Sequence, residues 1–99
     1  MKNYLYDIKK SLDQRNFEKA QILVNKCNID TLSVDEQAQL LLYRGLCSFE
    51  MKGMDKAKED FMECIMFCKE NKISNWPTPY YELSLVFFRN IYMEKKRQI

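Results

Sequence analysis

The chain has 99 residues, 46% hydrophobic and 30% charged, a composition typical of one folded domain that argues against a disordered chain. No segment reaches the ~18 apolar residues in a row that a membrane-spanning helix needs. The formal net charge of +2 gives no general field for binding polyanions, and the basic run Lys95-Lys96-Arg97 is interpreted as a solvated helix end.

Glycine and proline occur only twice each, so the chain lacks the turn residues that a series of short strands would need, and we expect an all-α fold. The first two helices are expected over residues 2–28 as an antiparallel hairpin. Apolar residues recur three or four positions apart in both, as at Leu5, Ile8 and Leu12 in the first. The second is expected to begin at Asn16, whose side chain suits the cap position.

A second hairpin is expected over residues 34–71. Its first helix has the clearest start in the sequence, because Ser33 and Glu36 have the spacing of a capping box. That helix is expected to end near Gly53, since glycine readily adopts the left-handed backbone that closes a helix.

A closing helix is expected over residues 79–96. The stretch 76–79, Trp-Pro-Thr-Pro, predicts a turn before it, because proline lacks a backbone N–H and disfavours helix in the preceding residue. Thr78 then caps the helix, with Pro79 in its first turn. The whole chain, residues 1–99, is expected to form one domain of five helices.

The four cysteines, at positions 27, 47, 64 and 68, each lie in or beside an apolar helical stripe. We interpret them as reduced thiols that pack as small hydrophobic side chains. A four-cysteine zinc site needs paired ligands on a loop, and the chain has no histidine, so neither a metal nor a cofactor is expected. Reduced thiols, and the lack of an apolar signal core near the start, lead us to expect a cytoplasmic or nuclear protein.

A repeated spacing links the two hairpins. The pattern Phe17-x-x-Ala20-x-x-x-Val24-x-x-Cys27 recurs as Asp55-x-Ala57-x-x-x-Phe61-x-x-Cys64, with Ala20 and Ala57 in equivalent places. Helix hairpins that repeat in this way stack into a solenoid, in which each unit buries one face against the next. The alternative is a five-helix bundle without repeats, which would have the same apolar stripes.

The recurring small and aromatic positions resemble those of tetratricopeptide repeats. Gly45, Ala57, Phe61 and Cys64 match that family in the second unit, Tyr4, Phe17 and Ala20 in the first, and Tyr80, Leu83, Ser84 and Phe87 in the closing helix. The chain departs from the family at Ile8, where glycine is preferred, and at Ser48, where tyrosine is usual. The resemblance covers most of the chain and implies a short solenoid of about two and a half repeats.

In tetratricopeptide repeats, the first helix of each hairpin lines a concave face that holds another polypeptide, and the resemblance implies the same here. The side chains expected to bind a partner are Tyr6, Lys9, Leu42, Tyr43, Leu46, Phe49, Tyr81, Leu85, Phe88 and Arg89. Most of them are apolar, which favours an apolar helix or peptide of a partner protein over a charged chain end. The alternative for Leu42 and Leu46 is that they close the chain's own core.

The sequence contains no set of residues suited to catalysis. Histidine is absent, no glycine-rich phosphate loop is present, and Glu59-Asp60 is interpreted as a solvated helix face. We therefore expect a protein-binding adaptor, scaffold or small chaperone-like subunit of a complex, and no enzyme. The alternative is RNA binding by a pentatricopeptide-like repeat, which two units and a net charge of +2 disfavour.

The closing helix is apolar on every side, with four consecutive apolar residues over 85–88. One buried stripe leaves part of such a helix uncovered, and uncovered apolar surface marks interaction sites. We predict that this helix docks against a partner chain or a second copy of itself.

Overall fold

The computed structural model describes residues 4–71, 84–91 and 93. The helices there are α1 (Tyr4–Asp13), α2 (Phe17–Lys26), α3 (Val34–Met51) and α4 (Met54–Asn71), with a 3-10 turn, η1 (Ile29–Thr31), between α2 and α3. Residues 84–91 are also helical, and these residues together with Met93 are called the C-terminal segment below. The expectation of an all-α fold is confirmed, while the expected turn at 76–79 and the ends of the closing helix lie outside the described residues.

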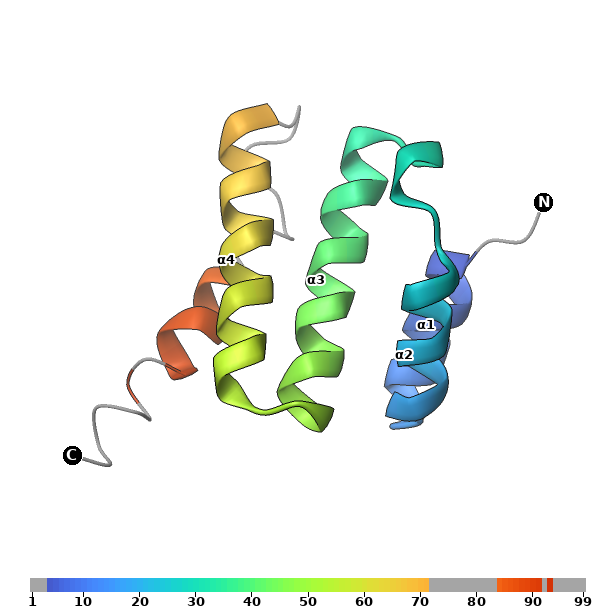
Figure 1. The fold of residues 1–99 in the computed structure, drawn as a ribbon, viewed down its shortest axis with the longest axis horizontal. Coiled ribbons are helices and arrows are strands. Elements are labelled where there is room, and N and C mark those ends of the chain that lie inside the picture. Colours follow the sequence, from blue (N-terminus) through green and yellow to red (C-terminus); the bar gives the residue numbers. More distant parts are fainter. Residues whose placement is uncertain (1–3, 72–83, 92, 94–99) are drawn as a thin grey trace.

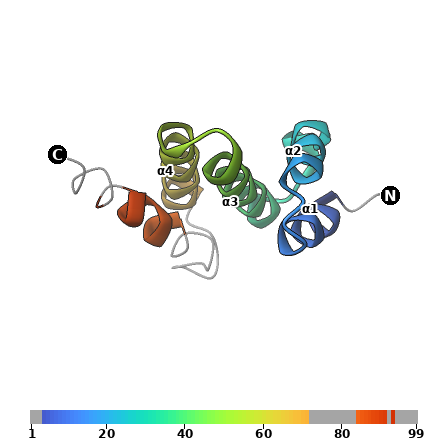
Figure 2. The same cartoon turned by 90° about the horizontal axis from the view of Figure 1, so that it is seen from below.

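Helices α1 to α4 each run opposite to the one before, and α3 lies between α4 and the pair formed by α1 and α2 (Figure 1). Helices α1 and α2 pack together, as do α3 and α4, and α3 also contacts both α1 and α2. Seen along the helices, α2 and α4 lie toward one side of the molecule, and α1 and the C-terminal segment lie toward the other (Figure 2).

Local interactions explain where the helices begin and end. The Asn16 side chain accepts a hydrogen bond from the Lys19 N–H at 3.3 Å, which caps α2. At the start of α3, Ser33 and Glu36 each accept a hydrogen bond from the other's N–H, at 3.3 and 3.1 Å. Gly53, between α3 and α4, has a φ of +93°, which glycine adopts at less cost than other residues. These three predicted boundaries are confirmed.

The connection between the two hairpins contains a short helical turn, for which the sequence analysis made no structural assignment over residues 29–32. Helix α2 ends at Lys26, and the chain then forms η1. The Asn28 side chain accepts a hydrogen bond from the Asp30 N–H at 3.1 Å, and the Asn28 carbonyl accepts one from the Thr31 hydroxyl at 2.7 Å. Because these bonds are local side-chain and turn contacts, the apolar periodicity used to find the longer helices does not reveal them.

Two groups of buried apolar side chains form the core. The first lies between α3, α4 and the C-terminal segment and comprises Ala38, Leu41, Leu42, Ala57, Phe61, Cys64, Cys68 and Ile91. The second joins α1 and α2 to α3 and comprises Leu5, Ile8, Ala20, Leu23, Val24, Leu40, Tyr43 and Cys47. Leu46 packs against both groups, so α3 is the central helix and buries apolar residues on both of its sides.

The Phe61 ring of α4 packs directly against the backbone of α3 at Gly45. A Cβ atom at this position would lie 2.5 Å from two carbons of the Phe61 ring, so only glycine leaves room for the ring there. The Phe87 ring in turn stacks on Phe61, with centroids 5.1 Å apart and planes 11° from parallel. Phe61 therefore links α3, α4 and the C-terminal segment.

Candidate functional site

The two predicted binding residues in α1 lie on the surface. Tyr6 is 64% exposed. Lys9 is exposed and pairs with Asp13, one turn further along α1, at 3.1 Å between Nζ and Oδ2. This surface ion pair contributes little to stability, because water screens both charges. Tyr6 and Lys9 are therefore exposed, and their role in binding stays a prediction.

The predicted binding residues in α3 are mostly covered by the chain itself. Leu42 is 3% exposed and Tyr43 is 7% exposed, and they belong to the two different core groups. The prediction that Leu42 and Tyr43 lie on an exposed binding face is therefore wrong. Both are buried because α1 and α2 cover one side of α3 and α4 covers another. Leu46 is half-buried between the groups, in line with the core alternative, whereas Phe49 at the end of α3 is exposed.

Three predicted binding residues lie in the C-terminal segment. Leu85 and Phe88 are half-buried, and Arg89 is exposed. Phe88 packs against the first core group, and the Lys58 ammonium lies 5.7 Å from the centroid of its ring. The tenth predicted residue, Tyr81, lies outside the described residues.

A shallow groove lies between α4 and the C-terminal segment. Its volume is about 740 Å³, and its lining comprises Asp55, Lys58, Glu59, Met62, Glu63 and Phe88. Two apolar side chains are therefore surrounded by three carboxylates and one ammonium group. Of these residues, sequence reasoning identified only Phe88 as a binding residue. The α4 residues have the spacing of one helical face, but that they lie beside the C-terminal segment depends on how α4 packs.

Further apolar side chains are exposed on α4 and on the C-terminal segment, and we call Met62, Met66, Val86, Phe88 and Met93 together the C-terminal patch. Met62, Met66, Val86 and Met93 are all exposed, and Phe88 is half-buried. Met66 lies one helical turn beyond Met62 on α4, and Val86 and Met93 are two turns apart on the C-terminal segment. Val86 and Met93 lie on the side of the segment away from Phe88, since Val86 is two residues before Phe88 in the helix.

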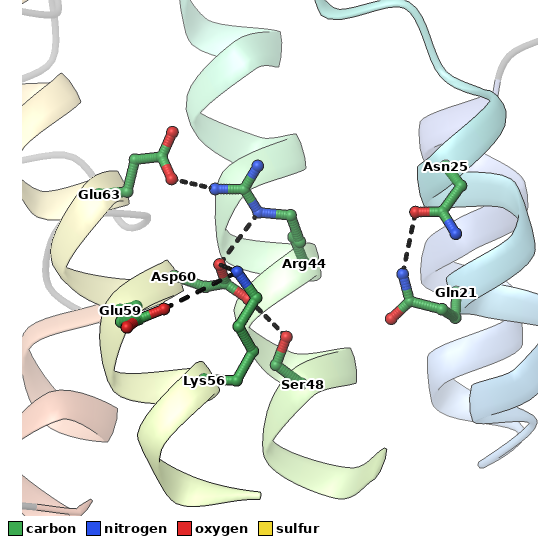
Figure 3. A network of polar contacts seen from close by, with 8 residues as sticks. All are labelled: Gln21, Asn25, Arg44, Ser48, Lys56, Glu59, Asp60 and Glu63. Atoms are coloured by element: carbon green, nitrogen blue, oxygen red, sulfur yellow. Dashed lines mark hydrogen bonds and ion pairs between the residues drawn. The ribbon is translucent and has the colours of Figure 1, made fainter. Parts of the chain in front are cut away.

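A second cluster, which the sequence analysis missed, is polar and lies between α3 and α4 (Figure 3). Asp60 is 1% exposed, so the interpretation of Glu59-Asp60 as a solvated face is wrong for Asp60. The Ser48 hydroxyl donates a hydrogen bond to Asp60 at 2.5 Å. Arg44 Nε lies 3.3 Å and Lys56 Nζ 3.4 Å from the other carboxylate oxygen. The buried carboxylate is thus compensated by two cations, as buried charge requires.

The outer part of this cluster reaches the edge of the groove. Arg44 Nη2 donates a hydrogen bond to Glu63, and Lys56 Nζ lies 3.9 Å from Glu59. The burial of Asp60 could have been predicted from the sequence, because Asp60 lies three residues after Ala57 and four before Cys64, within the buried stripe of α4. The cluster connects the two helices, and its Ser48 hydroxyl and Asp60 carboxylate are both buried.

The cysteine side chains pack as small apolar groups. Cys47, Cys64 and Cys68 are buried, and Cys27 is half-buried. Burial raises the pKa of Cys47 to about 11 and the pKa of Cys64 to about 12, so both thiols hold their protons at neutral pH. Within the part of the chain that the structure describes, three or more potential metal-ligating side chains do not come together, and no helix is both long and apolar enough to cross a membrane.

Comparisons with known proteins do not assign the chain to a class. No family model matches it, and neither a curated protein nor a solved structure does. A functional proposal therefore depends on the surfaces described above.

Proposed function

We propose that this protein is a non-catalytic interaction module, an adaptor or small subunit of a complex, that binds an apolar helix of another polypeptide through the C-terminal patch. The observation that carries the proposal is that α4 and the C-terminal segment, which pack together, expose four large apolar side chains, namely Met62, Met66, Val86 and Met93. Apolar side chains gathered in one area of a folded surface are a feature of interaction sites, because a partner removes them from water.

The chemistry of the patch favours a helix as the bound element. An extended peptide is often held by backbone hydrogen bonds to the edge of a sheet, and the described residues 4–71, 84–91 and 93 include no strand. An amphipathic helix needs only an apolar surface for its anchoring side chains. The groove supplies one between Met62 and Phe88, with charged side chains around it.

The resemblance to tetratricopeptide repeats supports the same proposal. Of the residues that carry the resemblance in the second unit, Ala57 and Phe61 are buried in the core and Phe61 packs against Gly45. A small solenoid of this kind holds other polypeptides, and we propose a cytoplasmic or nuclear location for the complex.

The proposal is tested by site-specific photo-crosslinking in the native cell. A photo-reactive residue is placed at Val86 in one variant and at Ile22 in the other. Both positions are about half exposed, at 51% and 54%, but Ile22 lies on α2, away from the patch. We expect a discrete crosslinked polypeptide from position 86 that position 22 does not give. Equal crosslinking from both positions, or none from position 86, contradicts the proposal.

A further inference from the structure

The sulfur-containing side chains of this protein differ in their access to solvent. Four methionines have exposed fractions between 39% and 49%, namely Met51, Met62, Met66 and Met93. In contrast, the thiols of Cys47, Cys64 and Cys68 are buried in the two core groups. A small solute that diffuses up to the folded protein therefore reaches these thioether sulfur atoms and is kept away from these thiols.

Protonation gives the buried thiols a second protection against oxidation. The form of cysteine that a peroxide oxidises is the thiolate and not the thiol. Burial raises the pKa of Cys47 to about 11 and the pKa of Cys64 to about 12, so both stay protonated at neutral pH. A thioether has no proton to lose, and its oxidation needs no such ionisation. Burial and protonation therefore direct a peroxide to the exposed methionines.

Methionine supplies most of the exposed apolar side chains that the proposed function uses. Of the four exposed side chains in the C-terminal patch, three are methionines and the fourth is Val86. Met62 lines the groove together with Phe88, and Met66 lies one helical turn further along α4. A thioether is apolar and adapts to partners of varied shape, whereas its sulfoxide is polar. Oxidation therefore removes the property by which the patch holds an apolar helix.

We propose that Met62, Met66 and Met93 form a redox switch, in which oxidation by a peroxide releases the helix bound by the C-terminal patch. In this step, one oxygen atom passes from hydrogen peroxide to the thioether sulfur, which gives up two electrons. The O–O bond breaks, an S–O bond forms, and water leaves. A methionine sulfoxide reductase reverses the step with two electrons from a dithiol, which becomes a disulfide, and the oxygen leaves as water. This switch rests on the proposed function, because it regulates the same surface.

The first test treats the purified protein with hydrogen peroxide and locates the added oxygen by mass spectrometry of its peptides. We expect oxygen on the exposed methionines, while Cys47, Cys64 and Cys68 remain free to react with a thiol reagent after denaturation. The helix signal in circular dichroism should be unchanged, because the oxidised side chains are at the surface. Oxidation of the buried thiols before the methionines, or loss of the helix signal, overturns the inference.

The second test measures binding in an extract of the native cell, with a photo-reactive residue at position 86 of the purified chain. The chain is oxidised and the peroxide removed before the extract is added, so that only this protein carries sulfoxides. The yield of the crosslinked partner should fall roughly fivefold or more, because a sulfoxide that faces an apolar helix loses its hydrogen bonds to water. Treatment of the oxidised chain with a methionine sulfoxide reductase should restore the yield.

A matched control is Met51, which is 44% exposed but lies on α3, outside the patch. Met62→Leu, Met66→Leu and Met93→Leu combined in one variant keep the side chains apolar and of similar volume but remove the sulfur. Peroxide should therefore not reduce the crosslinking of this variant. The Met51→Leu variant should lose crosslinking on oxidation as the unchanged protein does.

Two results of the second test overturn the inference and leave the proposed function standing. One is a crosslink of the unchanged protein that oxidation does not weaken. The other is a Met51→Leu variant that resists peroxide as well as the combined variant does. A chain without sulfoxides that gives no crosslink from position 86 contradicts the proposed function, and the inference fails with it.

Discussion

At Gly45, the absence of a Cβ atom leaves room for the Phe61 ring of the neighbouring helix. The position lies in the middle of α3, where alanine is normally more favourable than glycine by about 1 kcal/mol. Its Cβ would, however, lie 2.5 Å from the Phe61 ring, which is itself buried beneath Phe87. Overpacking at such a contact costs about 1–3 kcal/mol. We expect Gly45→Ala to lower the free energy of unfolding, measured by chemical denaturation, and an increase would contradict this packing.

Asp60 and its neighbour Glu59 differ in burial although they are adjacent in the sequence. Asp60 accepts a hydrogen bond from Ser48 and lies beside two cations, so Asp60→Ala should destabilise the fold by about 1–3 kcal/mol. The effect is moderated because Arg44 and Lys56 are partly exposed and remain hydrated. Glu59→Ala is the control and should change stability by less than about 0.5 kcal/mol. Equal effects of the two substitutions in denaturation experiments would contradict the observed burial.

The buried thiols predict a loss of stability at high pH. In the unfolded chain, a cysteine thiol loses its proton near its usual pKa of 9.0, whereas in the fold the pKa of Cys64 is about 12. The unfolded state therefore ionises first, and the free energy of unfolding should fall as the pH rises from 9.0 towards 12.

Other groups titrate in the same range, so the measurement compares variants. Cys64→Ala should show a shallower fall of stability with pH than the unchanged protein, because it removes one thiol that ionises only on unfolding. Cys27, which is half-buried and whose pKa burial raises to a smaller extent, is the control position. Identical pH profiles for the unchanged protein and Cys64→Ala would show that this thiol does not contribute.

At the scale of the helices, α3 depends on the cap at its first turn. Ser33 and Glu36 together satisfy two N–H groups that have no partner within the helix. Ser33→Ala removes one acceptor and should destabilise the fold by about 1 kcal/mol, detected as a lower thermal midpoint. Because α3 is the central helix, the loss should appear as reduced stability of the whole fold and not as local fraying. Thr31→Ala, in η1, is a nearby control whose hydroxyl bonds only within its own turn.

At the scale of the whole molecule, the C-terminal segment is part of the core although it is distant from α3 in the sequence. Phe87 stacks on Phe61 and also lies 6.2 Å from Phe49 between ring centroids. Phe87→Ala should therefore destabilise the fold by about 1–3 kcal/mol, since a half-buried aromatic ring loses part of its apolar contacts. Hydrogen exchange should become faster in α3 and α4 as well as in the segment. Faster exchange confined to the segment would show that it packs independently.

The sequence by itself determined the helical class and most helix boundaries, because these depend on neighbours within four residues. Asn16, Ser33 with Glu36, and Gly53 each act through a local hydrogen bond or a backbone angle. The tertiary structure alone decided which apolar residues are exposed. Leu42 and Val86 both belong to apolar runs, and one is in the core while the other is at the surface, because burial depends on which helices cover a position.

In the candidate site, too, some residues could be selected from the sequence and others are brought together only by the tertiary structure. Phe88 could be selected from the sequence, since the closing helix is too apolar to be covered on all sides. The groove beside it could not, because Asp55, Glu59 and Met62 face the segment only after α4 has packed against α3. Asp60 became a buried charge for the same reason, as its partners Arg44 and Ser48 come from α3. Interactions within a helix are encoded by spacing along the chain, whereas contacts between helices depend on how their faces pack.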